Sequence, residues 1–332
     1  MKKILFIITQ SFALFKEKIL FMNKRKRKKW HKKNKESAIE KTSIINKFPS
    51  PKWIVVGESV IGKSHINSNI PCQDNNFNTF FEKNWGIAIV CDGAGSAKNS
   101  DKGAEFSARR ALPLCFEELI KKEKWIENNQ LPTLEEWQDK ATTEFKKTFE
   151  ALSNVAIENN IELSNLACTA IVVIFSPIGL LVAHVGDGRA GFRDEKGKWS
   201  SIITPHKGEE ANQTIFLTSN IWYKEPNLKM SEVSVPECRV IDEKPTAFVL
   251  VSDGCEQHSF ECSIIDPNTG KWSDPNQPYD KFFNPLIDTL HEMATSPTTV
   301  DMQESWKIFL ERGTEGLSNE SDDKTMILGI FQ

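Results

Sequence analysis

Three predicted strands run directly into an Asp-Gly step, and a fourth begins just after a pair of aspartates. In an antiparallel sheet the end of one strand lies beside the start of its neighbour, so these carboxylates are expected to converge on one edge. The aspartates concerned are Asp92, Asp187, Asp253 and the pair Asp322 and Asp323.

Converging carboxylates repel one another unless cations neutralise them. Oxygen ligands without cysteine or a histidine cluster favour Mg²⁺ or Mn²⁺ over zinc. Two such ions about 4 Å apart could hold a bridging hydroxide and a phosphoryl oxygen together, which would give hydrolysis without a covalent enzyme intermediate. A single Asp-Gly step is more typical of a turn, so the prediction depends on the conjunction of all four.

The elements that must position these residues are short apolar runs rich in Ile and Val, which fit strands covered on both faces. Two long segments with apolar residues at three- and four-residue spacing lie between the second and third strands and predict helices against a sheet. Residues 176–179 predict a hairpin turn, residues 205–245 an inserted flap or irregular excursion, and residues 261–280 a loop. The predicted strands are 53–60, 85–91, 169–175, 180–185, 247–251 and 325–331; the predicted helices are 101–125, 134–159, 280–293 and 300–313.

The charge is unevenly distributed along the chain. Residues 1–50 carry +12, whereas the remaining residues carry −15, giving a net charge of −3. We therefore predict a basic, flexible leader at 1–50 and one large domain at 51–332. Seven scattered cysteines without a C-x-x-C pair indicate neither a disulfide framework nor a zinc knuckle, and they favour a reducing, cytoplasmic location.

The leader combines an apolar stretch at 4–15 with a polybasic run at 24–29. The apolar stretch is shorter than the roughly 20 residues that span a bilayer. Three interpretations stay open: a peripheral membrane anchor formed by residues 1–35, an arm that binds nucleic acid, and a solvated tail. The acidic body would repel phosphate backbones, so we expect no nucleic-acid partner.

Six short motifs of the sequence resemble those of the metal-dependent protein phosphatase 2C family, and specifically its bacterial-type branch. They occur in the same order as in that family. The resemblance runs from about residue 53 to the C-terminus, and six ordered motifs are far more specific than any one of them. The motifs are Ser59–Gly62 followed by Cys72–Asp74, Val90–Gly95, Ala167–Ala170, Val185–Ala190, Val251–Gly254 and Asp322–Thr325.

The resemblance implies an α+β fold, a four-layer α-β-β-α sandwich with two antiparallel β-sheets and a binuclear metal centre between them. It also implies a role for each matching residue. Asp92 would bridge two metal ions and the Gly93 carbonyl would contribute to the second, while Asp253 and Asp322 would hold the first. Asp74, or Gln73 beside it, would bind the second ion. Asp187 matches a position linked to a weaker third ion, and Thr169 and Arg189 are expected to be structural.

The sequence departs from the family pattern in three places, one of which is Ala94, where eukaryotic members often have a histidine. Many members have an arginine shortly after the first glycine to bind the substrate phosphate, and here Lys63 or His65 is available instead. His65 could also protonate the leaving group, or it is an ordinary loop histidine. Gln257 replaces an aspartate that many members have, so a third ion would be weaker or would recruit Glu256.

The expected function is a Mn²⁺- or Mg²⁺-dependent hydrolase that removes phosphate from phosphoserine or phosphothreonine in proteins, within a Ser/Thr kinase system. The rival interpretation is a catalytically weak or silent relative that binds phosphoproteins and regulates such a system. The missing arginine supports the rival. The retained aspartates oppose it, because clustered carboxylates without ions would be a burden.

Overall fold

The computed structural model describes residues 52–206, 214–223, 235–265, 267, 270–296 and 301–332. These residues belong to one compact unit, Lys52–Gln332. The predicted leader lies outside the described residues, so its boundary and its membrane role stay predictions. Within the described residues, no helix combines the length and the apolar character needed to cross a membrane.

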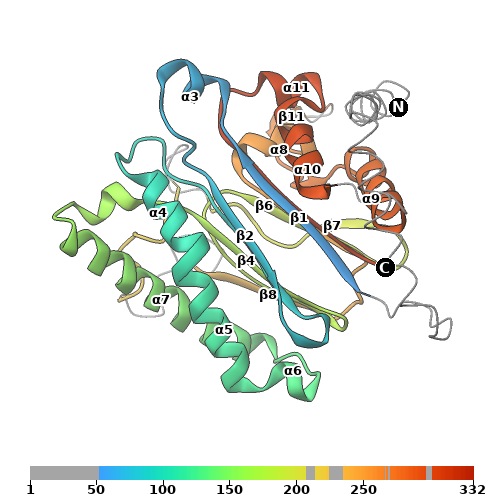
Figure 1. Cartoon of the computed structure of the whole chain (residues 1–332), viewed down its shortest axis with the longest axis horizontal. Coiled ribbons are helices and arrows are strands. Elements are labelled where there is room, and N and C mark those ends of the chain that lie inside the picture. Colours follow the sequence, from blue (N-terminus) through green and yellow to red (C-terminus); the bar gives the residue numbers. More distant parts are fainter. Residues whose placement is uncertain (1–51, 207–213, 224–234, 266, 268–269, 297–300) are drawn as a thin grey trace, which may run out of the picture. The chain divides into compact units, whose positions relative to one another are not determined.

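Two five-stranded sheets form the centre of the unit, and every strand pair in them is antiparallel (Figure 1). The first sheet has the order β1 (Trp53–Val60), β14 (Lys324–Phe331), β9 (Ala247–Val251), β6 (Arg189–Arg193) and β7 (Trp199–Ser201). The second has the order β2 (Asn75–Phe80), β3 (Gly86–Cys91), β4 (Ala170–Ser176), β5 (Gly179–Val185) and β8 (Glu237–Ile241).

Helices cover the outer face of each sheet, which confirms the predicted α-β-β-α sandwich (Figure 1). The second sheet is covered by α4 (Ser100–Phe106), the π-helical turn η2 (Ser107–Ala111), α5 (Leu112–Glu123) and α7 (Leu134–Glu158). The first is covered by α8 (Asp253–Ser259), α9 (Asp280–Thr295) and α10 (Met302–Arg312). Shorter elements are α3 (Lys63–Ser68), η1 (Glu82–Asn84), α6 (Trp125–Asn128), η3 (Leu163–Leu166), α11 (Glu315–Asn319), β10 (Phe260–Glu261), β11 (Ile264–Ile265), β12 (Trp272–Ser273) and β13 (Gln277–Pro278).

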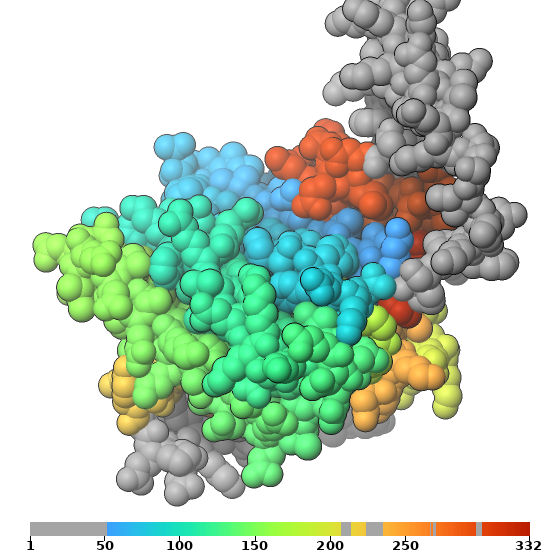
Figure 2. Space-filling view, turned by 60° about the horizontal axis from the view of Figure 1, so that its bottom comes forward, coloured from blue at the N-terminus to red at the C-terminus, as the bar shows by residue number. Residues whose placement is uncertain are grey.

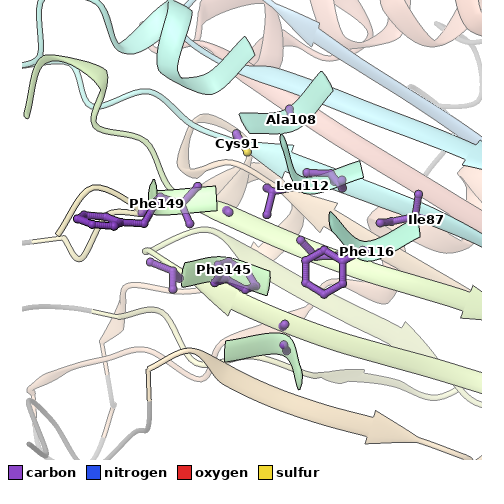
Figure 3. Close-up of a cluster of buried hydrophobic side chains, with 14 of the residues drawn as sticks. Ile87, Cys91, Ala108, Leu112, Phe116, Phe145 and Phe149 are labelled. Atoms are coloured by element: carbon purple, nitrogen blue, oxygen red, sulfur yellow. The ribbon is translucent and has the colours of Figure 1, made fainter. Parts of the chain in front are cut away.

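The packing of these layers follows from the alternation of side chains along each strand. On β3, Ile87 and Cys91 face Leu112 and Phe116 of the helical layer (Figure 3). The neighbouring residues of the same strand, such as Ala88, point into a second core between the two sheets. Both faces of the strand are therefore buried, which explains its continuous apolar sequence. The face shown in Figure 2 is formed largely by the green helices between residues 100 and 160.

Each predicted strand and helix is present, with ends that differ by a few residues. The predicted 176–179 turn is confirmed, because Ser176 pairs with Gly179 across the β4–β5 hairpin. The interpretation of 205–245 as an excursion was wrong at its end, because β8 pairs with β5 at the edge of the second sheet. The predicted 261–280 loop contains short strand pairs. β2 and β6 were missed because their sequences are polar or glycine-containing.

Candidate metal centre

The strand-end aspartates meet in one cavity of about 190 Å³. They come from the ends of both sheets: Asp92 and Asp187 follow strands of the second sheet, whereas Asp253 and Asp322 adjoin strands of the first. The expectation of a single sheet edge was therefore wrong, although the convergence itself is present. The lining residues are Gln73, Asp74, Asp92, Gly93, Ala94, Gly95, Ser96, Thr169, Asp187, Thr214, Phe216, Asp253, Asp322 and Asp323.

Asp74 is a buried carboxylate held by two hydroxyl groups. Its Oδ2 accepts hydrogen bonds from Ser252 Oγ at 2.7 Å and from Thr325 Oγ1 at 2.8 Å. Burial raises the pKa of Asp74 to about 7; the two hydroxyl groups lower it, and nearby carboxylates such as Asp323 raise it further. Gln73, the alternative ligand, instead donates from Nε2 to Ser100 Oγ at 2.8 Å. The Asp74 carboxylate thus offers a charged oxygen to a cation, whereas the Gln73 side chain offers a neutral amide oxygen, and the choice between them stays a prediction.

Asp92 and Asp253 both lie beside other carboxylates, which raises the pKa of each. Burial raises the pKa of Asp92 well above its ordinary value, and the charges of Asp74 and Asp253 raise it further. The pKa of Asp253 is raised to about 7 by burial first and by Asp322 next. In both cases the charged form is disfavoured because like charges are held together in a poorly solvated space. A bound cation would reverse that cost.

Thr169 and Gly93 fix the backbone beside Asp92. The Asp92 amide donates to Thr169 Oγ1 at 3.1 Å, and the Thr169 amide donates to the Asp92 carbonyl at 2.8 Å. A Cβ atom on Gly93 would lie 2.6 Å from the Gln73 carbonyl oxygen, so a larger residue would displace the backbone. Thr169 was predicted to pack behind the site; it supports the backbone beside Asp92, but it also lines the cavity.

Asp187 is held from a segment that the sequence did not connect with the site. Thr214 Oγ1 donates to Asp187 Oδ2 at 2.5 Å, and Phe216 lines the same cavity. Gly186, at φ +123°, supplies the turn before Asp187, and a Cβ there would lie 2.4 Å from Thr169 Cβ. Thr214 and Phe216 belong to the 205–245 region, whose polar composition gave no signal that they would reach the aspartates.

Asp323 is a second residue whose role the sequence did not indicate. It accepts backbone hydrogen bonds from Gly62 N at 2.7 Å and Gln73 N at 2.6 Å, and its Oδ2 lies 2.9 Å from His65 Nδ1. Asp323 therefore ties the segment between β1 and β2 to the start of β14. Its neighbour Asp322 accepts the Asp323 amide through Oδ1 at 2.8 Å, and both aspartates line the cavity.

The two candidate phosphate-binding residues are placed differently from the aspartates. Lys63 Nζ donates to Asn319 Oδ1 at 2.6 Å on the surface. His65 contacts Asp323, and neither His65 nor Lys63 is among the lining residues of the cavity. Their roles toward substrate stay predictions.

Arg189 lies behind the site, as predicted. Its buried guanidinium donates to Glu256 Oε2 at 2.7 Å and to both carboxylate oxygens of Asp274 at 3.0 and 2.7 Å. Glu256 is therefore engaged in an ion pair, which disfavours the idea that a third metal ion recruits it. Arg189 instead connects α8, which begins with Asp253, to the strand pair β11–β12.

The donor set suits hard divalent cations. Among the described lining residues the ionisable groups are all carboxylates, with no cysteine or histidine, and oxygen donors of this kind select Mg²⁺ or Mn²⁺. Burial and neighbouring carboxylates raise the pKa values of Asp74 and Asp253, so a bound cation would stabilise their charged forms.

Comparisons with known proteins find a family profile and a relative that each match most of the chain. The family profile described as "Protein phosphatase 2C" matches residues 61–311. The chain is 26% identical over 290 residues to "Serine/threonine-protein phosphatase 3" of Escherichia coli (strain K12), covering 84% of this chain and 98% of that protein.

Similar solved structures include the catalytic domain of the serine/threonine protein phosphatase PstP in complex with two manganese ions (15% identity, TM-score 0.48, covering 85% of this chain and 99% of that one). Another is the serine/threonine phosphatase Stp1 from Staphylococcus aureus (14% identity, TM-score 0.47, covering 88% of this chain and 98% of that one).

The profile spans more than half of the chain, so this protein belongs to the protein phosphatase 2C family. The predicted family is therefore confirmed, and with it the predicted class of enzyme, a phosphoprotein phosphatase.

Proposed function

We propose that the aspartate cavity hydrolyses phosphoserine and phosphothreonine side chains of protein substrates with two bound Mn²⁺ or Mg²⁺ ions. The observation that carries the proposal is the meeting of Asp74, Asp92, Asp253 and Asp322 in one cavity, in a chain that belongs to a phosphatase family. When bound, the two ions supply an activated water and neutralise the charge that develops on the phosphoryl group.

Aspartates of the cavity are the proposed ligands of the two ions. Asp92 lies among the other carboxylates and is the proposed bridging ligand, supported by the Gly93 carbonyl. Asp253 and Asp322 are the proposed ligands of one ion, and Asp74 of the other. Ser252 and Thr325 donate to only one carboxylate oxygen of Asp74, Oδ2, which leaves Oδ1 for a cation.

The rim of the site is proposed to supply the contacts with substrate. His65 is the proposed proton donor to the leaving alkoxide, since its Nδ1 lies against Asp323 Oδ2 and its Nε2 is the ring nitrogen proposed to face the substrate. Lys63, two residues earlier on α3, is the proposed electrostatic contact with the phosphoprotein. Asp187 is proposed to hold a weaker third ion.

The cellular setting completes the proposal. The substrates are phosphoproteins of a Ser/Thr kinase system. The seven cysteines are scattered along the sequence without a C-x-x-C pair, which supports a reducing, cytoplasmic location. The basic and apolar sequence of residues 1–35 supports peripheral contact with an anionic membrane.

The test is hydrolysis of a phosphothreonine peptide by the full-length chain with Mn²⁺. Asp92→Asn should reduce kcat by about a thousandfold or more, because it removes the charge of the central ligand. Asp288→Asn, at an exposed position on α9, is the matched control and should keep full activity. Full activity in chelator, or in Asp92→Asn, would contradict the proposal.

A silent phosphoprotein-binding regulator is the second candidate. It is favoured by one observation: no lysine, arginine or histidine is among the described residues that line the cavity. Calorimetric titration separates the two functions. Absence of Mn²⁺ binding at millimolar concentration, together with retained binding of a phosphopeptide, would select the silent protein.

A further inference from the structure

A second group of metal-binding side chains lies outside the aspartate cavity. It consists of His184 on β5, Glu237 on β8 and His206 beyond β7, and one ligand-type atom of each lies within 4.8 Å of the others. All three residues are at least 98% buried. None of them lines the aspartate cavity.

The strand register brings two of these side chains together. His184 and Glu237 are direct partners in the antiparallel β5–β8 pair, so their side chains lie on the same face. That face looks into the core between the two sheets, where Val182 of the same strand also packs. A histidine and a glutamate are unusual neighbours for this apolar layer.

The hydrogen bonds of His184 determine which ring nitrogen has a free lone pair. Its Nε2 lies 2.7 Å from the Gly186 carbonyl, which can only accept, so Nε2 carries the hydrogen. Nδ1 therefore bears the lone pair and has no hydrogen-bond partner. It faces Glu237 Oε2 at 3.7 Å. Burial, followed by the neighbouring His206, lowers the pKa of His184 well below its ordinary value, so the ring is neutral.

The Nδ1 atom of His184 and the Oε2 atom of Glu237 thus face each other across 3.7 Å in a buried space. We propose that His184, His206 and Glu237 form a separate site for a transition-metal dication such as Zn²⁺. Zinc binds imidazole nitrogen and carboxylate oxygen at about 2.0–2.2 Å, so tetrahedral ligands lie about 3.4 Å apart, close to the observed separation. Two imidazoles and one carboxylate select zinc over Mg²⁺.

The surroundings support each ligand. In a metal-binding histidine, the ring nitrogen that does not bind the metal normally donates a hydrogen bond to a backbone carbonyl or a carboxylate. His184 Nε2 donates to the Gly186 carbonyl in this way. Glu237 accepts from the Thr204 amide at 2.6 Å and from Arg239 at 2.7 Å, which holds its carboxylate in place. The His206 ring stacks on His184 with centroids 4.2 Å apart.

Metal binding would also act on the aspartate cavity. The Gly186 amide donates to His206 Nδ1 across a long 3.3 Å bond. If His206 binds the metal through Nδ1, that nitrogen can no longer accept from Gly186. If it binds through Nε2, Nδ1 carries the ring hydrogen and again cannot accept, so metal binding ends this bond in both cases. Gly186 directly precedes Asp187, so occupancy of the histidine site should alter the environment of Asp187.

The test uses the full-length Asp92→Asn/Asp253→Asn variant, which weakens the aspartate site, loaded with one equivalent of Zn²⁺. X-ray absorption should show nitrogen ligands with the outer-sphere scattering of imidazole, since no histidine lines the described aspartate cavity. A zinc coordinated by oxygen alone would overturn the proposal. This measurement needs no change at the histidine site, so it does not depend on the folding of a core variant.

Substitutions then assign the ligands. In the same background, His184→Gln and Glu237→Gln should each weaken Zn²⁺ binding more than about tenfold. His291→Gln and His65→Gln are the matched controls and should leave binding unchanged. Equal affinity in all four variants would overturn the proposal, as would loss of the imidazole signal in a control variant. Neither readout uses phosphatase activity, so its outcome is independent of the proposed function.

Discussion

His65 Nδ1 lies 2.9 Å from Asp323 Oδ2, although one residue follows β1 and the other precedes β14. The same carboxylate receives the amides of Gly62 and Gln73. One buried aspartate thus contacts the histidine, anchors the segment around α3 that carries it, and directly follows the proposed ligand Asp322. The proposed role of His65 as proton donor can therefore be tested by substitution.

We expect His65→Gln to lower kcat on a phosphothreonine peptide by about 100-fold, because the departing alkoxide needs a proton. On p-nitrophenyl phosphate, whose leaving group needs no proton, the effect should be less than about threefold. Steady-state kinetics on both substrates at saturating Mn²⁺ checks this expectation. Equal losses on the two substrates would show that His65 only positions the loop.

The stability of the metal-free protein should depend on pH through Asp74 and Asp253. Their pKa values are about 7 in the folded protein and 3.8 ordinarily, so the folded state binds more protons between these limits. This stabilisation is present at low pH and is lost as the pH rises through about 7. In chelator, the Tm should therefore fall from about pH 5.5 to about pH 8, and Mn²⁺ should restore it.

Asp253→Asn isolates this effect from buried His184, whose lowered pKa acts in the opposite direction at acid pH. In chelator at about pH 8, the variant should have a higher Tm than the wild type, because one buried charge is removed. At about pH 5.5 the difference should shrink, since the wild-type carboxyl is already protonated. Asp288→Asn should change neither value. A lower Tm of Asp253→Asn at the higher pH would refute the repulsion.

Arg189→Met should lower the free energy of unfolding by about 2–3 kcal/mol. Breaking a fully buried ion pair lowers the free energy of unfolding by more than this amount. Here solvent screens the partners Glu256 and Asp274, whose side chains are 22% and 28% exposed. Arg239→Met removes a half-exposed guanidinium and should cost less than about 1 kcal/mol. Urea denaturation measures both. Equal losses would mean that burial of Arg189 adds nothing to its ion pairs.

Phe145→Ala should destabilise the protein by about 3–5 kcal/mol, because it opens a cavity in the helical layer shown in Figure 3. Phe145 stacks on Trp222 at 5.9 Å and 21°, and Trp222 belongs to the segment that brings Phe216 to the metal centre. The KM for a phosphopeptide should therefore rise as well. Ile157→Ala, on the exposed face of α7, should change stability by less than about 0.5 kcal/mol.

The sequence alone determined the strands that carry the aspartates. Continuous apolar runs such as Ile87–Cys91 are readable because both faces of these strands are buried. The step from an apolar strand to an adjoining aspartate was equally clear in the sequence, which is why Asp92, Asp253 and Asp322 could be named in advance. Polar strands such as β2 and β8 were missed, since their pairing depends on neighbours rather than on their own composition.

Only the tertiary structure decided which distant groups meet. The sequence suggested one sheet edge, whereas packing of two sheets face to face brought aspartates from both to the same cavity. Thr214 and Asp323 acquired their roles in the same way, because a hydrogen bond is specified by position in space and not by spacing along the chain. The pairing of His184 with Glu237 likewise follows from strand register alone.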